Sequence, residues 1–186
     1  MKNNFAETLE SYVIEPANEL YVDYFQDYDE NFKREKVSLN DFTVLIINES
    51  NYSQISNQYR KLDLPWFNKK HMLKEGVIWV RVLTKDPKPK VVATAEVWNA
   101  KLAMDEKVAR FDSKPYDERK TYLQDLSVRK EFQGRGIGKQ LLKFMISKLN
   151  IGYCEIYAES QVALKVYQSV GFKTYETRDG VYFLKR

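Results

Sequence analysis

Three glycines within five residues are the feature of this sequence with the clearest chemical use. They lie in Gln133-Gly134-Arg135-Gly136-Ile137-Gly138-Lys139, between a β-rich segment and an amphipathic one. Glycine lets a backbone turn tightly and approach a ligand closely, and the start of a helix presents unpaired N–H groups and a positive dipole end. The pattern predicts a cradle for a phosphate or pyrophosphate. The alternative is a glycine-rich turn that only connects two packed elements.

The segments around this loop have the pattern of a parallel βαβ unit. Residues 122–128 are predicted to form a strand, because they are β-rich and apolar. Residues 137–149 carry an apolar stripe at helical spacing, and residues 153–159 alternate as a second strand. Two strands joined by one helix pair in parallel, so we expect the loop at the carboxyl end of the first strand.

The rest of the chain supplies further strands and short helices. We predict strands at 42–47, 77–83 and 91–98, helices at 52–62 and 66–74, and a long non-periodic connection over 100–119. A helix after Ser160 should end at Gly171, and the turn Asp179-Gly180 should join a closing hairpin. Residues 11–15 could form a short strand, and residues 20–25 could form either a helix or a strand. The sequence therefore indicates a mixed α/β fold.

Length and composition narrow the functional classes. The 186 residues suit one domain, and the single cysteine and single histidine make an intramolecular disulfide impossible and disfavour a metal site. The net charge is +4, yet residues 5–30 hold eight acids and no Lys or Arg. The chain has no dense basic stripe, which disfavours a nucleic-acid partner. It also has no apolar run of membrane-spanning length or signal-peptide core, so we expect a cytoplasmic protein.

These motifs together resemble the GNAT superfamily of acyl-CoA-dependent N-acyltransferases. Leu126-Ser127-Val128 followed by Gln133 to Gly138 is similar to the family's strand end and its (Gln/Arg)-x-x-Gly-x-(Gly/Ala) loop. The segment Ala163 to Phe172, with Tyr167 and Gly171, is similar to the family's Ala…Tyr…Gly-Phe helix. The resemblance covers residues 42–186 and leaves 1–41 as an acidic extension of one single domain.

The resemblance implies an α+β fold and a specific co-substrate. The fold would be a mostly antiparallel twisted sheet with one parallel βαβ crossover at the cofactor site and helices on both faces. The donor would be acetyl-CoA or another acyl-CoA. Its pantetheine arm would bind the backbone of Leu126, Ser127 and Val128. Its pyrophosphate would bind the loop residues Gln133, Gly134, Arg135, Gly136, Ile137, Gly138 and Lys139.

Tyr167 matches the family's usual general acid, which protonates the departing CoA thiolate. Two positions depart from the family pattern. Ser160 stands where many members have Asn, so it can cap the helix and lie at the cofactor site but offers no side-chain amide. Tyr122 stands where some members place a catalytic Glu on the strand before the loop.

The sequence therefore does not identify the general base. The sequence offers Asp125, Glu96 on the preceding strand, and His71, and each is also explained as an ordinary solvated or ion-paired residue. A water chain is a further alternative. Cys154 is expected to be a small buried hydrophobe rather than an acylated intermediate, which favours direct transfer in a ternary complex.

The leading hypothesis is an N-acetyltransferase that acts on a primary amine of a small molecule, protein or peptide. The alternative from another class is a non-catalytic acyl-CoA-binding or sensing module. A nucleotide-binding protein is disfavoured, because the glycine spacing fits neither a P-loop nor a dinucleotide fingerprint. The acceptor pocket should involve the region before Gly76, residues 100–119 and the closing hairpin. Oligomeric state stays open, and a homodimer is compatible with the sequence.

Overall fold

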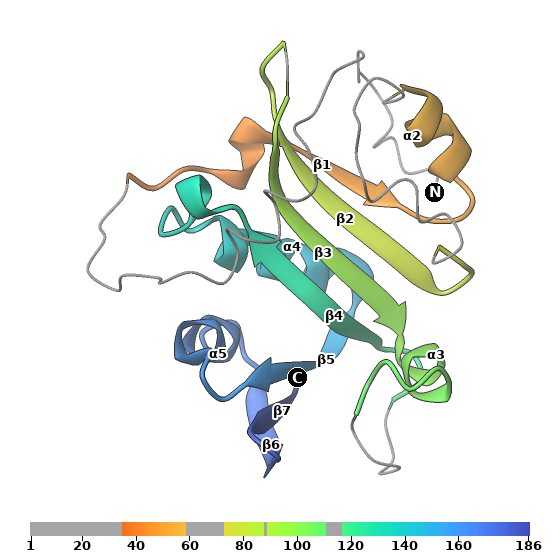
Figure 1. Ribbon diagram of the computed structural model, residues 1–186, viewed down its shortest axis with the longest axis vertical. Helices are drawn as coiled ribbons and strands as arrows, with labels where there is room; N and C mark the ends of the chain where they lie inside the picture. The colour runs from red at the N-terminus through yellow and green to blue at the C-terminus, as the bar shows by residue number, and fades with distance from the viewer. Residues whose placement is uncertain (1–34, 59–72, 88, 111–116) are drawn as a thin grey trace.

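Seven strands of the described chain form one sheet with a single parallel pair. The computed structural model describes residues 35–58, 73–87, 89–110 and 117–186. The sheet has the order β1-β2-β3-β4-β5-β7-β6 (Figure 1). Its strands are β1 (Phe42–Ile47), β2 (Val77–Thr84), β3 (Val91–Asn99), β4 (Thr121–Val128), β5 (Ile151–Tyr157), β6 (Lys173–Arg178) and β7 (Val181–Lys185).

The strand directions confirm the predicted topology. Neighbouring strands are antiparallel except β4 and β5, which are parallel. The connection between these two is α4 (Ile137–Leu149), whose bounds match the predicted helix. The closing hairpin turns through Asp179 and Gly180, both at positive φ, as its sequence requires. The glycine loop thus follows the strand that begins the parallel unit.

Each face of the sheet packs against its own helices. On one face, α4 and α5 (Gln161–Gln168) bury a cluster that includes Leu141, Leu142 and Leu164. On the other face, α2 (Tyr52–Gln58) and α3 (Ala100–Asp105) contribute to a second cluster around Trp79 and Trp98. Helices therefore cover both faces, as expected for this fold. We call these the α4 face and the α3 face.

One predicted connection contains a helix. Residues 100–119 were expected to be non-periodic, but the structure forms α3 at Ala100–Asp105. The helix begins because the Asn99 side chain accepts a hydrogen bond from the Leu102 amide, at 3.1 Å, and it buries Ala100 and Ala103. Six residues are too few to show a helical period, which explains why the expectation was wrong.

The remaining differences concern boundaries. β5 begins at Ile151 and ends at Tyr157, two residues earlier at each end than predicted. The first helix is described as α2 up to Gln58. Of the predicted helix 66–74, residues 66–72 lie outside the described residues and residues 73–74 are not helical. Residues 11–15 and 20–25 also lie outside the described residues. Two 3-10 turns complete the described elements, η1 (Leu39–Asp41) and η3 (Lys130–Phe132). Among the helices in these ranges, none has the length and apolar character needed to cross a membrane.

The cap of α3 gives a direct test of this account. We expect Asn99→Ala to lower the free energy of unfolding by about 1 kcal/mol, because the Leu102 amide loses its side-chain acceptor. Urea denaturation measures the change. Asn99→Asp is the matched control, since it keeps an acceptor at the same position and should retain most of the stability. Equal losses for both variants would show that the cap does not stabilise α3.

Candidate active site

The edge of β4 loses its strand partner halfway along. The parallel pairing of β4 with β5 runs through Tyr122 and ends at Leu123 opposite Cys154. Beyond this point β5 pairs with β7, and β4 keeps β3 as its only strand partner within the described ranges. The backbone of Leu126, Ser127 and Val128 lies on this freed edge, where the resemblance to the GNAT superfamily predicts contacts with pantetheine. Strand N–H and C=O groups without a ladder are available to bind an extended ligand.

A β-bulge turns the side chains of this same segment. Glu96 lies opposite Asp125, while the next residue of β3, Val97, lies opposite Leu123, so Gln124 is an extra residue in β4. An extra residue shifts the alternation of side chains by one. Leu126 and Val128 consequently pack on the α4 face, and Asp125 points to the other face with Tyr122. The bulge thus places a carboxylate on the α3 face, beside the freed edge.

The glycine loop turns through two glycines with positive φ and packs closely on β4. Gly134 and Gly136 have φ of 71° and 89°, in the left-handed region that favours glycine. A Cβ on Gly138 would lie 3.4 Å from a Val128 methyl group, so the helix start packs closely on β4. Gln133 fixes the loop to the strand by donating its side-chain amide to the Val128 carbonyl, at 2.8 Å. The amides at the start of α4 are therefore held at the end of the freed edge.

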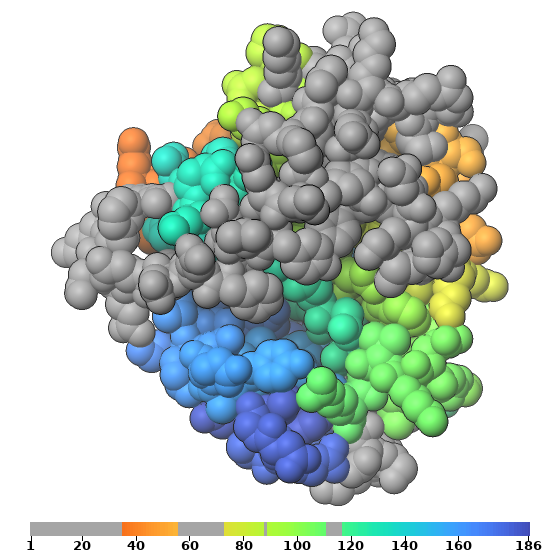
Figure 2. Space-filling model, viewed as in Figure 1, coloured from red at the N-terminus to blue at the C-terminus, as the bar shows by residue number. Residues whose placement is uncertain are grey.

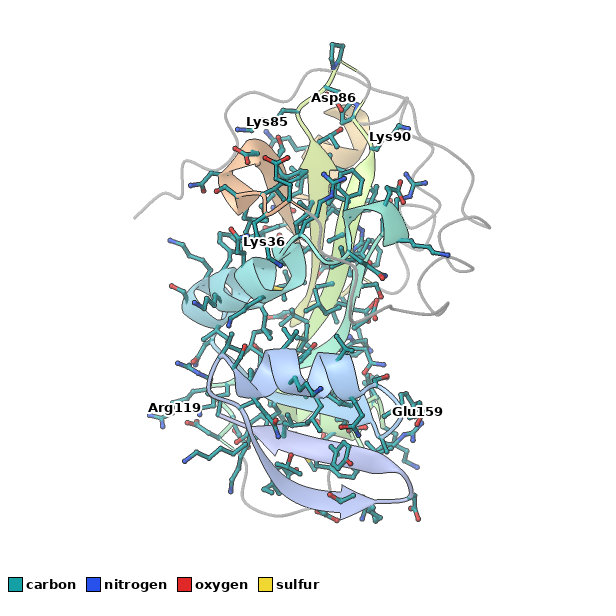
Figure 3. All side chains as sticks on the ribbon, turned by 90° about the vertical axis from the view of Figure 1, so that its left-hand side faces the viewer. Lys36, Lys85, Asp86, Lys90, Arg119 and Glu159 are labelled. Atoms are coloured by element: carbon teal, nitrogen blue, oxygen red, sulfur yellow. The ribbon has the colours of Figure 1, made fainter. Side chains whose placement is uncertain are left out.

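The charges at this loop fit an anionic ligand. Arg135 has a buried Nε that makes no hydrogen bond within the described part of the chain, while its guanidinium lies 5.7 Å from the centre of the Phe132 ring. Lys139 is exposed on the first turn of α4. Lys36, from the segment before β1, donates to the Gly134 carbonyl at 2.8 Å and lies beside α4 (Figure 3). A pyrophosphate would meet these cations and the helix N-terminus together.

The segment before β1 is tied to the loop by one side chain. The Gln140 side chain accepts a hydrogen bond from the Leu39 amide at 2.9 Å and donates to the Val37 carbonyl at 2.7 Å. The Val37 amide also donates to the Arg135 carbonyl, at 3.3 Å. These contacts link positions about 100 residues apart, so no local pattern in the sequence predicts them. The boundary of the acidic extension at residue 41 stays a prediction, but residues 36–39 contact the candidate site.

Tyr167 enters the site from α5. Its side chain is 6% exposed and packs edge-to-face against Phe172, with 5.6 Å between ring centres. Burial raises the pKa of Tyr167 well above its usual value, and the nearby Cys154, Asp125 and Tyr122 raise it further. The hydroxyl therefore stays protonated at neutral pH and is available as a donor. Its neighbours Tyr122 and Asp125 of β4 and Cys154 of β5 place it where these two strands separate.

The two predicted acids face each other across β3 and β4. Glu96 accepts a hydrogen bond from the Trp98 indole at 2.6 Å, so its carboxylate already has a strong partner. The Asp125 residue is exposed to solvent, yet the protein packed around its carboxylate partly desolvates it and so raises its pKa. The Ser127 hydroxyl, at 3.1 Å, and the charge of Arg81 act in the opposite direction. The structure brings Asp125, but not the indole-bound Glu96 carboxylate, into the electrostatic surroundings of Tyr167.

A third acid lies at the same place and was missed from the sequence. Glu155 follows Cys154, the last β5 residue paired with β4. Its carboxylate hydrogen-bonds the Tyr122 side chain and accepts the Arg110 amide at 2.5 Å. Burial raises the pKa of Glu155, against the effect of these hydrogen bonds. The only local signal in the sequence for a functional Glu155 was its place between Cys154 and Ile156, which are buried on the other face of β5.

Ser160 and Cys154 take ordinary positions. Ser160 is at the N-cap of α5, but its side chain makes no capping hydrogen bond. Cys154 is buried, and burial raises the pKa of its thiol, which fits the expected small hydrophobe. His71 lies outside the described residues. Over the described ranges, no group of three or more His, Cys, Asp or Glu side chains is placed to hold a metal ion.

Comparison with known proteins shows what this part of the chain is similar to. The family model of the acetyltransferase (GNAT) domain matches residues 91–174, from the start of β3 into β6. The GNAT domain of S. lividans PAT has a similar fold, with a TM-score of 0.52 at 13% identity over 86% of this chain and 99% of that one. An acetyltransferase from Thermus thermophilus has a TM-score of 0.53 at 12% identity, over 81% and 99%. Curated proteins give no significant match.

The matched segment contains the freed edge of β4, the glycine loop, α4 and α5. At these low identities the two structures show the fold, and the family match covers the part of the chain that carries these elements. Residues 91–174 thus match the acetyltransferase (GNAT) domain, and the described fold is similar to that of GNAT-domain structures.

The contact between Gln140 and the segment before β1 can be tested alone. We expect Gln140→Ala to lower the free energy of unfolding by about 1–2 kcal/mol, because the Leu39 amide and Val37 carbonyl lose their partner. Urea denaturation measures the loss. Gln140→Glu keeps the acceptor for Leu39 but loses the donor to Val37, so an intermediate loss is expected. A Gln140→Ala protein as stable as wild type would contradict this assignment.

Proposed function

We propose that this protein transfers the acetyl group of acetyl-CoA to a primary amine, by direct attack in a ternary complex. The observation that carries the proposal is the position of the freed β4 edge. One end of this edge meets the glycine loop and α4, and the other end lies beside Tyr167. An extended thioester with a diphosphate at its far end matches this arrangement.

The donor would be held by backbone and cationic groups. The amides of Gln133 to Lys139 would bind the pyrophosphate, with Arg135 and Lys36 adding positive charge. The backbone of Leu126, Ser127 and Val128 would pair with the pantetheine arm, as a strand partner does. Ser160 lies at the start of α5, on the other side of the separated strands. Amides aimed at the thioester carbonyl stabilise the oxyanion of the tetrahedral intermediate.

Tyr167 would assist the departure of the CoA sulfur. As the C–S bond breaks, the thiolate takes the proton of the Tyr167 hydroxyl, which burial keeps on the oxygen at neutral pH. Positioned general acids contribute about 10²–10⁴-fold to a rate. Cys154 would take no covalent part, since burial keeps its thiol protonated.

The acceptor would approach from the α3 face. Asp125 and Glu96 lie on that face and would stabilise a bound ammonium group, with Asp125 the better candidate for accepting its proton. The proposed acceptor is therefore a positively charged primary amine of a small molecule, protein or peptide. A cytoplasmic location stays an expectation.

Substitution of Tyr167 tests the proposal. We expect Tyr167→Phe to lower kcat for amine-dependent CoA release by about 10²-fold. The affinity for acetyl-CoA should change little, because the ring and its packing on Phe172 remain. Thiol release with a panel of primary amines and peptides measures kcat, and calorimetry measures affinity.

The control is Tyr182→Phe, which removes a partly buried hydroxyl from β7. It should leave kcat unchanged. A wild-type protein that binds acetyl-CoA but acetylates none of the amines would instead support the sensing module. Full activity of Tyr167→Phe would contradict the role of this hydroxyl.

A further inference from the structure

The α3 face of the candidate site carries an arginine to which the proposed reaction gives no role. Arg110 lies between α3 and β4, and its backbone amide donates to the Glu155 carboxylate at 2.5 Å. Glu155 is the first β5 residue after the pairing with β4 ends. Its neighbours Cys154 and Ile156 are buried on the α4 face, so Glu155 points to the α3 face. Arg110 therefore borders the place where β4 and β5 separate, on the face from which the acceptor would approach.

The Arg110 side chain extends to Tyr157, near the end of β5. The guanidinium donates to the Tyr157 hydroxyl at 3.2 Å, and its central carbon lies 5.7 Å from the centre of the Tyr157 ring. A cation at this distance from an aromatic ring is attracted to it. Tyr157 is 54% exposed, although large rings are mostly buried. The guanidinium is thus held at the surface by an exposed ring.

The backbone that carries Arg110 is tied to the closing hairpin. Arg178 of β6 donates to the Arg110 carbonyl at 2.8 Å, while the Arg110 amide is bound to Glu155. Figure 2 shows the stretch around α3 next to the C-terminal strands on one face of the molecule. Both backbone groups of Arg110 are therefore satisfied, so its side chain starts from a fixed position.

The guanidinium keeps hydrogen-bonding capacity toward solvent. A guanidinium is a planar fork of N–H donors that binds a carboxylate through two parallel hydrogen bonds. The contact with Tyr157 uses one of these donors. Over the described ranges, no carboxylate lies within ion-pair distance of the Arg110 guanidinium, because Glu155 binds the backbone amide instead. Arg119 differs, since both of its outer contacts go to Asp117, at 2.8 and 2.9 Å.

We propose that Arg110, held by Tyr157, binds a carboxylate of the acceptor, so that the substrate is a zwitterionic amino acid rather than a simple amine. This inference rests on the proposed function. The ammonium end would lie near Asp125, where the strands separate, and the carboxylate end against Arg110. Tyr157 is a positioning residue in this scheme, because it acts through Arg110.

The spacing along β5 indicates how far apart the two charges of the acceptor are. Tyr157 is three residues beyond Cys154, the last β5 residue paired with β4. At about 3.3 Å per residue, this corresponds to about 10 Å along the strand. The acceptor would therefore carry its amine and its carboxylate several bonds apart, as in an ω-amino acid or on an amino acid side chain.

A zwitterionic acceptor also fits the mixture of charges on the α3 face. Asp125 and Glu96 are acids on β4 and β3, whereas Arg110 and Arg178 lie at the side of the C-terminal strands. An arginine beside the path of a purely cationic amine would repel it. A ligand with charge of both signs would be attracted at each end.

The test measures kcat/KM for pairs of acceptors that differ only in a carboxylate. Glycine, 4-aminobutanoate and 6-aminohexanoate are each compared with their amides, at saturating acetyl-CoA. Wild type should prefer the acid over the amide at one of the longer chain lengths. Arg110→Gln should lower this preference by about tenfold and leave kcat/KM for the amide nearly unchanged. Because each protein is compared on the same two amines, the difference between their own pKa values cancels.

Three further variants separate binding by the fork from a general effect of charge. Arg110→Lys keeps the charge without the fork and should lose part of the preference. Tyr157→Phe keeps the ring and loses the hydroxyl contact, so a smaller loss is expected. Arg119→Gln is the matched control, because it removes the same charge from a side chain that is 87% exposed (Figure 3). It should keep the wild-type preference. Urea denaturation checks that each variant is folded.

The carboxylate could belong to a free amino acid or to an acidic residue of a peptide. Amidated peptides with glutamate or glutamine beside a lysine distinguish these sources. A preference for glutamate that Arg110→Gln removes would support the carboxylate site with a peptide as its source. The same result with the free amino acids alone would support a small-molecule acceptor.

The outcomes keep this inference apart from the proposed function. If wild type acetylates each acid and its amide equally well, or if Arg110→Gln keeps the wild-type preference, the role of Arg110 is wrong and the proposed function stands. An equal loss of preference in Arg119→Gln would also overturn it, because it would show a long-range effect of charge. A folded wild-type protein that binds acetyl-CoA but acetylates no amine overturns both.

Discussion

The early end of the pairing between β4 and β5 is the constraint on which the rest of this structure depends. Two parallel strands that stayed paired to their ends would satisfy each other's backbone and leave no edge for a ligand. Here the ladder stops at Leu123 and Cys154, and β5 continues with β7 instead. β4 therefore keeps one free edge inside the sheet. The loop, α4 and α5 are arranged around that edge.

The bulge in β4 sends side chains of one strand to both faces of the sheet. With Gln124 inserted, Leu126 and Val128 pack under α4 while Asp125 points to the opposite face. Tyr167 reaches the edge from α5, on the α4 face, and Glu155 projects from β5 on the α3 face. The proposed proton donor for the leaving group and the proposed acids for an incoming amine thereby lie on opposite faces of the sheet. The proposed chemistry follows from that separation.

The loop and most strands could be predicted because their conformations are specified by residues close together in the sequence. The three glycines, the helical stripe of α4 and the Asp179-Gly180 turn each specify a conformation within a few residues. The site residues that were missed depend on pairings distant in sequence. Glu155 is a candidate because it hydrogen-bonds Tyr122 and Arg110, and Lys36 is one because it hydrogen-bonds Gly134. The helix α3 was missed because a side-chain cap and two buried alanines, rather than a repeated period, define it.

Calorimetric titration with acetyl-CoA tests the central claim most directly, with wild type beside Gly136→Asp. Gly136 has φ of 89°, and an aspartate there would strain the loop and place a negative charge in the proposed phosphate cradle. The account predicts micromolar binding by wild type that Gly136→Asp abolishes while its fold is retained. Absence of binding by folded wild-type protein, or equal binding by both proteins, would contradict it.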